Sequence, residues 1–382
     1  MGTTLYKLVN QPRLNGGYVK KRIVWNNETL RQDYGKHFLA TVPKYDGFCT
    51  VPEHVNYQPV VGKFLNLYEP IDHQPQEGDF PSIRSLVEHI FGEQYELGMD
   101  YLQLLYLQPI QKLPILLLVS EERNTGKSTF LNFLKALFQN NVTFNTNEDF
   151  RSQFNSDWAG KLLIVVDEVL LSRREDSERL KNLSTTLSYK VEAKDRDEIA
   201  FFAKFVLCSN NEYLPVIIDV EETRYWVRKI DRLQSDDTDF LQKLKAEIPA
   251  FLYHLQHRQL STEKKSRMWF APSLLHTEAL QYIIRSNRNR LEVEMHELIL
   301  DIMDRVGIDT FSFCPDDILF LLGNSHVKAE RHQVRRVLQE RWKLKPAHNT
   351  FTYTTYQVDY TRECRYAPKR TTCLLYTSPS PR

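Results

Sequence analysis

Residues 113–137 read LPILLLVSEERNTGKSTFLNFLKAL, and this stretch decides the fold of the chain. The apolar run 113–119 has the length and composition of a buried strand, and a polar, turn-prone segment follows it. The tetrapeptide GKST at 126–129 then opens an amphipathic helix. Strand, loop, Gly-Lys-Ser and helix in this order predict a phosphate-binding loop.

The loop residues suggest how a nucleotide would be held. Gly126 lets the backbone approach phosphate, and the helix N-terminus presents free N–H groups and a positive dipole end. Lys127 would reach the β- and γ-phosphates of ATP, and the Ser128 hydroxyl would ligate Mg²⁺. The expected nucleotide-contacting residues are Glu122, Arg123, Asn124, Thr125, Gly126, Lys127, Ser128 and Thr129.

One position departs from the phosphate-loop pattern. The full motif is G-x-x-x-x-G-K-[ST], and Glu121 stands where the first Gly belongs. A carboxylate near bound phosphates is unfavourable unless it points away from them. The alternative interpretation is an ordinary strand-to-helix turn with a surface lysine. The motifs in the rest of the sequence are needed to choose between these two interpretations.

A second apolar strand, 160–168 (GKLLIVVDE), ends in two carboxylates in a Walker B pattern. A buried parallel strand would deliver both beside the loop. Asp167 would then hold Mg²⁺, directly or through water, and Glu168 would orient or deprotonate the attacking water. The alternative is a core strand that ends at solvent, where acidic residues are common.

Two further features follow in order. A third buried strand, 205–209, ends in Asn210 and Asn211, and an Asn at this place can position the attacking water or sense the γ-phosphate. Spacing does not decide between the two. Arg224 then begins another strand, where it forms either a local salt bridge or an arginine finger for a neighbouring subunit, worth about 10³–10⁵ in rate.

Two segments are candidates for contact with nucleic acid. Residues 189–202 (YKVEAKDRDEIAFF) predict a hairpin with a charged tip, which is either a solvated turn or a DNA contact through Lys190, Lys194 and Arg196. Residues 291–362 predict helices near 291–306, 315–322 and 328–342 and then a hairpin, a winged-helix arrangement. Its third helix carries Arg331, Arg335 and Arg336, which would meet DNA or form a solvated face of an interaction domain.

Length and composition bound the architecture. The 382 residues with 42% hydrophobic content suggest two or three domains with real cores. We expect an α/β fold: an AAA+ P-loop NTPase core with a parallel sheet, a helical lead-in and a C-terminal winged-helix-like domain. The expected parts are an N-terminal segment of unknown role (1–75), the ATPase domain (76–260), a basic helical linker (261–290), the winged-helix-like domain (291–362) and a tail (363–382).

Each end of the chain allows two interpretations. Residues 1–75 are either a small β-rich piece or the end of a larger upstream domain. Residues 373–382 (CLLYTSPSPR) match what one reading frame of a common sequencing-library adapter encodes, so we expect a foreign tail and a lost natural C-terminus. The alternative is a disordered tail rich in Ser and Pro.

Charge and cysteine content narrow the partners. The net charge is only +1, so a nucleic-acid partner must be met by a local patch. No apolar run approaches the length of a membrane span, and we expect no membrane partner. The five cysteines are scattered without metal-ligand spacing, which favours reduced thiols in the cytoplasm.

The order of these motifs resembles the superfamily III helicases of viruses, phages and plasmids, which are ring-forming AAA+ ATPases. It is most similar to the helicase part of phage and mobile-element primase–helicase proteins. The strings NLYEP, TGKSTFLNFL, VVDE, EAKDRDE, LCSNNEYLP and ETRYWV carry the resemblance, which covers about residues 60–260. The C-terminal part fits more loosely.

The resemblance implies an ATP- and Mg²⁺-dependent helicase that unwinds DNA during phage or mobile-element replication in the cytoplasm of a bacterial host. It implies a homo-oligomeric ring, a hexamer, with single-stranded DNA in its channel and a primase module or protein as partner. Lys194 becomes a candidate DNA contact, Asn210 or Asn211 the sensor, and Arg224 the arginine finger. Two alternatives stay open: a nucleotide-switched, DNA-binding replication initiator without unwinding activity, and an NTPase with another role, such as packaging.

Overall fold

The structure is a computed structural model of the chain. It describes residues 4–12, 18–149, 158, 160–171, 174–186, 188–190, 198–219, 222–233, 237–324, 329–347, 349–358, 366–373 and 376–379. Three apolar cores organise these residues. Two lie on opposite faces of a central sheet, and the third lies in the C-terminal region.

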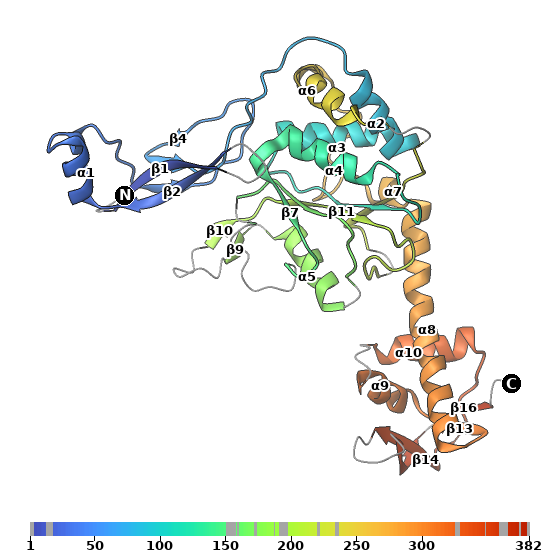
Figure 1. The fold of residues 1–382 in the computed structure, drawn as a ribbon. Coiled ribbons are helices and arrows are strands. Elements are labelled where there is room, and N and C mark those ends of the chain that lie inside the picture. Colours follow the sequence, from blue (N-terminus) through green and yellow to red (C-terminus); the bar gives the residue numbers. More distant parts are fainter. Residues whose placement is uncertain are drawn as a thin grey trace.

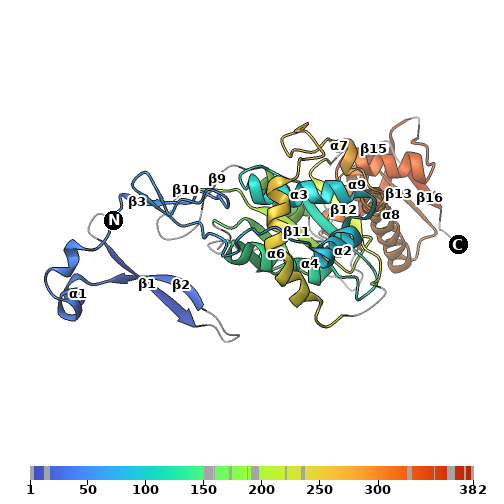
Figure 2. The ribbon, with the colours of Figure 1, turned by 90° about the horizontal axis from the view of Figure 1, so that it is seen from above.

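The N-terminal region is an arm that extends away from the central body (Figures 1 and 2). Strands β1 and β2 pair as an antiparallel hairpin, and β3, β5 and β4 form a small three-stranded sheet. The elements of this region are β1 (Leu5–Pro12), β2 (Tyr18–Trp25), α1 (Asn27–Tyr34), a 3₁₀ turn (Phe38–Ala40), β3 (Gly47–Cys49), β4 (Val60–Val61) and β5 (Phe64–Asn66).

The centre of the molecule is a five-stranded parallel sheet in the order β12-β6-β11-β8-β7. Its strands are β6 (Ile115–Val119), β7 (Val142–Asn145), β8 (Leu163–Val166), β11 (Lys204–Ser209) and β12 (Tyr225–Lys229). Every residue of β6, β8 and β11 is buried, as expected for a parallel sheet covered on both faces. The predicted α/β class with a parallel sheet is confirmed.

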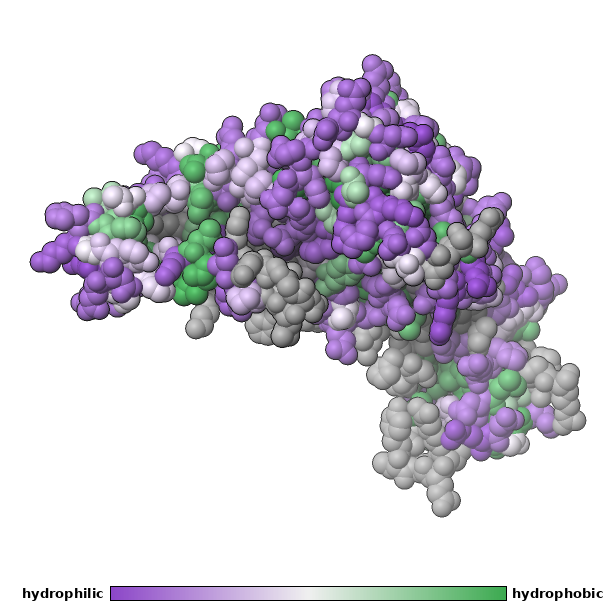
Figure 3. All heavy atoms as spheres, turned by 45° about the horizontal axis from the view of Figure 1, so that its top comes forward, coloured by the Kyte–Doolittle hydropathy of each residue, from purple (hydrophilic) through white to green (hydrophobic). Residues whose placement is uncertain are grey.

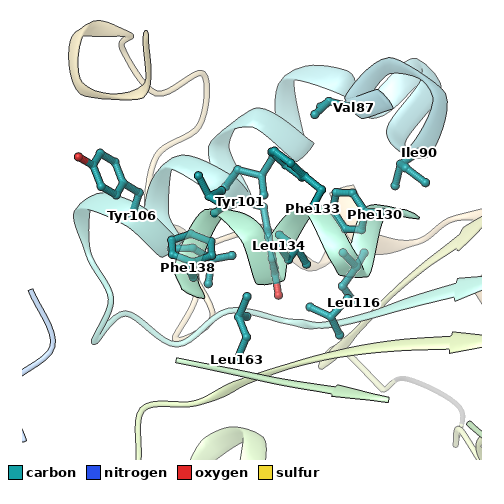
Figure 4. Close-up of a cluster of buried hydrophobic side chains, with 14 of the residues drawn as sticks. Val87, Ile90, Tyr101, Tyr106, Leu116, Phe130, Phe133, Leu134, Phe138 and Leu163 are labelled. Carbon is teal, nitrogen blue, oxygen red and sulfur yellow. The ribbon is translucent and has the colours of Figure 1, made fainter. Parts of the chain in front are cut away.

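Helices cover both faces of this sheet (Figure 1). One face carries α2 (Pro81–Phe91), α3 (Tyr95–Leu107), α4 (Lys127–Phe138) and α6 (Phe240–His257). A 3₁₀ turn at Gly92–Gln94 joins α2 to α3, and another at Gln139–Asn141 lies between α4 and β7. The other carries α5 (Arg174–Thr185) and the start of α8. Figure 4 shows aromatic and aliphatic side chains of α3 and α4 meeting strands β6 and β8. This packing fixes the loop before α4 against the sheet.

The predicted charged hairpin is present at its base. Strands β9 (Ser188–Lys190) and β10 (Glu198–Ala200) pair antiparallel, with Glu198 opposite Lys190. The tip between them, which holds Lys194 and Arg196, lies outside the described residues.

Helix α8 (Glu278–Val306) differs from the expected domain boundary. It is one helix of 29 residues that passes through the predicted end of the linker at residue 290. Thr277 caps its start by accepting the N–H of Leu280, and Gly307 ends it in a left-handed conformation. No Gly or Pro interrupts the sequence between these caps, so the basic run 285–290 continues the helix. Among the described helices, including short α7 (Pro272–Leu275), none is both long and apolar enough to cross a membrane.

The C-terminal region has its own core beneath α8. Its elements are β13 (Thr310–Phe313), α9 (Pro315–Asn324), α10 (Arg331–Arg336), a π-helical turn (Val337–Arg341), β14 (Phe351–Val358), β15 (Tyr366–Cys373) and β16 (Tyr376–Pro379). β14 pairs with β15, and β13 pairs with β16. The expected boundary at 362–363 therefore falls between two paired strands, because β14 finds its partner in the expected tail. The winged-helix assignment and the foreign origin of the last residues stay predictions.

Candidate functional site

The polar residues singled out in the sequence follow strands that end side by side. Val119 pairs with Ser209, and Val166 pairs with Leu207, so β6, β8 and β11 finish at one edge of the sheet. The ends of adjacent parallel strands are the usual position of ligand sites in α/β proteins. The loop after β6, the acidic pair after β8 and the amides after β11 are thereby brought together.

Two left-handed residues shape the loop between β6 and α4. Asn124 has a φ of 56°, and Gly126 has a φ of 79° and directly precedes α4. Gly adopts this conformation freely, and Asn tolerates it better than most residues. Leu233 covers both, because its N–H donates to Asn124 O at 3.0 Å and its Cδ1 would lie 3.4 Å from a Cβ at Gly126. The loop therefore brings bare backbone and the first N–H groups of α4 to this edge.

Lys127 is the cation of the site. It is buried at the first position of α4, and its Nζ donates to Oγ1 of Thr125 at 3.1 Å. Burial lowers the pKa of Lys127, while Asp167 is among the neighbours that oppose this shift. A bound anion would compensate the burial of this ammonium group.

Ser128 and Asp167 meet directly. The Ser128 hydroxyl donates to Oδ2 of Asp167 at 2.7 Å, which links the first turn of α4 to the end of β8. Both residues are exposed to solvent. A hydroxyl and a carboxylate side by side are the oxygen ligands that Mg²⁺ accepts together with phosphates and waters, so the residues present fit this ion.

The two asparagines after β11 make different contacts. Nδ2 of Asn210 lies 3.5 Å from Oε1 of Glu168, the second carboxylate of the acidic pair. Oδ1 of Asn211 instead accepts the backbone N–H groups of Tyr213 and Leu214 at 2.8 and 2.9 Å. Asn211 thus closes an Asx-type turn, and Asn210 is the amide directed at the acidic pair.

The structure also shows how the loop accommodates Glu121. Its φ is not in the left-handed region, so this position needs no Gly. Its backbone N–H donates to Oε1 of Glu212 at 3.1 Å. Its carboxylate lies near the Tyr213 hydroxyl, and Tyr282 first and Glu121 second raise the pKa of Tyr213. The carboxylate is therefore engaged by the segment after β11.

Residues that support the loop from a distance were missed in the sequence. Glu212 is buried, and its Oε2 lies 2.8 Å from Nζ of Lys229 in β12. His89 in α2 contacts the carbonyl oxygen of Thr125 through Nε2 at 3.0 Å. Glu212 lies within the string LCSNNEYLP, but the string does not show that its carboxylate contacts the loop, and no motif marks His89 or Lys229.

The structure does not bring Arg224 to the loop within one chain. The Arg224 carbonyl accepts the N–H of Ile115 at the start of β6, whereas the loop follows the end of that strand. The guanidinium Nη1 lies 3.1 Å from Oε2 of Glu222. In the isolated chain Arg224 therefore forms the local salt bridge, at the opposite end of β6 from the loop.

The expected DNA contacts are spread over two other regions. Lys190 lies in β9, and Lys194 and Arg196 lie outside the described residues. Arg331, Arg335 and Arg336 are all exposed on α10. Arg331 lies 2.9 Å from a carboxylate oxygen of Asp316 and Arg336 lies 3.8 Å from one of Glu340, so acidic side chains partly balance this face.

The fold and the clustered loop, hydroxyl and carboxylates define an α/β core of the phosphate-loop class. Residues 118–228 match the model of a family described as a family of unknown function (DUF5906). A search of curated proteins finds no match to the chain.

Three solved structures resemble this chain at low sequence identity, over different shares of its length. The apo structure of the NrS-1 C-terminal region (305–718) matches with a TM-score of 0.57 and 16% identity, covering 91% of each chain. The A form of the same region matches with a TM-score of 0.56 and 15% identity, covering 94% of this chain and 92% of that one. The JCV helicase matches at a TM-score of 0.28 and 16% identity over 60% of this chain and 65% of its own. The first two similarities cover more than nine tenths of this chain, and they concern its fold alone.

Proposed function

We propose that the chain is a ring-forming, Mg²⁺-dependent ATPase that unwinds DNA. The observation that carries the proposal is the direct hydrogen bond between Ser128 and Asp167, at 2.7 Å, beside the buried Lys127. A turn with a chance surface lysine would have no reason to bury that lysine against a paired hydroxyl and carboxylate. The site has the positive charge and the oxygen ligands that a nucleoside triphosphate and its metal ion require.

The chain's residues divide the work of hydrolysis. Backbone N–H groups at the start of α4 and the Lys127 ammonium would bind the β- and γ-phosphates. Ser128 and Asp167 would hold Mg²⁺, which neutralises charge on the transferred phosphoryl group. Glu168 would accept a proton from the attacking water, and Asn210, at 3.5 Å from its carboxylate, would orient that water.

A second subunit completes this arrangement in the proposal. Arg224 lies at the edge of the sheet opposite its own loop, and its side chain is about one third exposed. It would leave Glu222 and stabilise transition-state charge at the site of the neighbouring subunit. This requires a closed head-to-tail ring, for which we propose six copies around single-stranded DNA.

Strand displacement on a forked duplex tests the proposal. Wild type should unwind the fork with ATP and Mg²⁺, and Lys127→Ala should remove both turnover and unwinding while leaving the thermal unfolding transition in place. Arg224→Ala should lower turnover by about 10³-fold or more but keep nucleotide binding. Lys265→Ala, at an exposed lysine paired with Glu263, is the matched control and should behave as wild type. Full activity in Lys127→Ala would refute the proposal.

A replication initiator without unwinding activity is the second candidate. The exposed arginines of α10 favour it, because they give the C-terminal region its own potential DNA contact. Nucleotide binding without DNA-stimulated turnover, together with sequence-specific DNA binding lost in Arg335→Ala, would select this candidate instead.

A further inference from the structure

Residues 4–49, the outer part of the N-terminal arm, lack a core of their own. Among the described side chains of residues 4–49, none is buried. The β1–β2 hairpin pairs with no other described strand, and α1 buries no side chain. A two-stranded hairpin is at best marginally stable alone in water, and stable ones pack against a further element. The arm therefore depends on a surface outside itself.

One face of the hairpin is apolar and open. Tyr6 and Val24 are directly paired across the strands and so share a face with Leu8. Their exposed fractions are 42%, 65% and 63% for Tyr6, Val24 and Leu8 in turn. Tyr6 connects this face to the small three-stranded sheet, because its ring contacts that of Phe48 with the two ring centroids 5.5 Å apart. Hydrophobic side chains are visible along the arm in Figure 3.

We propose that this face, defined by Tyr6, Leu8 and Val24, docks on the body of a second copy of the chain. The arm points away from its own body, so that body cannot cover the face (Figures 1 and 2). The inference rests on the proposed function in one respect, because a ring needs contacts between neighbouring copies besides the one made by Arg224.

The net charges of the two parts of the chain indicate which molecule binds this apolar face. Residues 1–49 carry eight Lys or Arg and three Asp or Glu, a net charge of +5. The whole chain has a net charge of +1, so residues 50–382 have a net charge of −4. A basic arm and an acidic body attract each other between copies. DNA would also match the charge, but it offers no apolar cover for Leu8 and Val24.

Sedimentation velocity of the full chain tests this surface, with the double variant Leu8→Glu/Val24→Glu. Wild type should assemble, and the variant should associate at least about tenfold more weakly, because two carboxylates would be buried in the contact. The matched control is Ile110→Glu, since Ile110 is also 63% exposed but lies between α3 and β6. It should assemble as wild type does. A variant that assembles normally, or a wild type that stays monomeric at all concentrations, overturns the proposal.

A second measurement separates docking from misfolding and from DNA binding. In a mixture of isotopically light and heavy chains, amine-to-carboxyl cross-links from Lys7 or Lys21 should join light arms to heavy bodies. Cross-links confined to one isotope would overturn the proposal.

Binding of a fluorescent ATP analogue should be the same in wild type and the double variant. Loss of this binding in wild type would refute the proposed nucleotide site while leaving the docking result intact, and weaker DNA binding with normal assembly would favour DNA as the occupant.

Discussion

Glu212 offers a sharp test of how the phosphate loop is supported. Its buried carboxylate accepts the Glu121 N–H at 3.1 Å through one oxygen and meets Nζ of Lys229 at 2.8 Å through the other. Glu212→Ala removes both interactions. Glu212→Gln keeps an oxygen acceptor of similar position but removes the charge. Lys229→Met removes only the ion pair.

The structure sets different magnitudes for the two interactions. A hydrogen bond to a charged acceptor contributes ~1.5–3 kcal/mol. If binding must restore the loop, its loss raises the nucleotide dissociation constant about tenfold to a hundredfold. The ion pair contributes less, ~0.2–1 kcal/mol, because the Lys229 side chain is 59% exposed. We therefore expect a large effect in Glu212→Ala, an intermediate effect in Glu212→Gln, which loses the charge and the ion pair but keeps an acceptor, and an effect below about fivefold in Lys229→Met.

Titration with a fluorescent ATP analogue in Mg²⁺ measures these constants, and thermal unfolding controls for the fold. Equal dissociation constants for Glu212→Ala and wild type would refute the reasoning. Equal losses in Glu212→Ala and Lys229→Met would show that the ion pair, rather than the bond to Glu121, supports the loop.

Two further predictions concern stability. Phe133 is fully buried in the core of Figure 4, so Phe133→Ala should lower the free energy of unfolding by ~3–5 kcal/mol in urea denaturation. Burial lowers the pKa of Lys112 to about 8, so between pH 8 and 10 the unfolded chain binds more protons than the folded one, and the contribution of Lys112 to stability rises with pH. The difference in unfolding free energy between wild type and Lys112→Met should therefore change by ~1–2 kcal/mol across this range, and a constant difference would contradict the assignment.

The central core could be predicted because its signals are local. The runs that became β6 and β8 are continuously apolar and short, a pattern and length typical of buried parallel strands. The predicted helical lead-in includes α3, which ends at Leu107 because its apolar pattern stops just before Pro109. The meeting of Ser128 with Asp167 follows from the order of the motifs, since strands of one parallel sheet end at one edge.

Features that depend on tertiary contact could not be predicted. The basic run within α8 resembles a linker, although the caps of the helix lie well outside it at Thr277 and Gly307. Arg224 follows the motif order, but no spacing shows that it starts at the far edge of the sheet. The arm has the pattern of a β-rich piece, and only its burial shows that no core forms within its described residues.

Glu121 shows why a motif can be incomplete without losing its geometry. The first Gly of the pattern allows a turn that a side chain would strain, but here the left-handed residues are Asn124 and Gly126. The freedom normally given by that Gly is unnecessary at residue 121, where the backbone N–H donates to Glu212 and the carboxylate lies near Tyr213. Both partners lie just after β11, beside Asn210. Glu121 therefore couples the start of the loop to the strand end that carries the amide facing Glu168. A Gly at position 121 would keep the backbone contact to this strand end but would have no side chain to make the second contact.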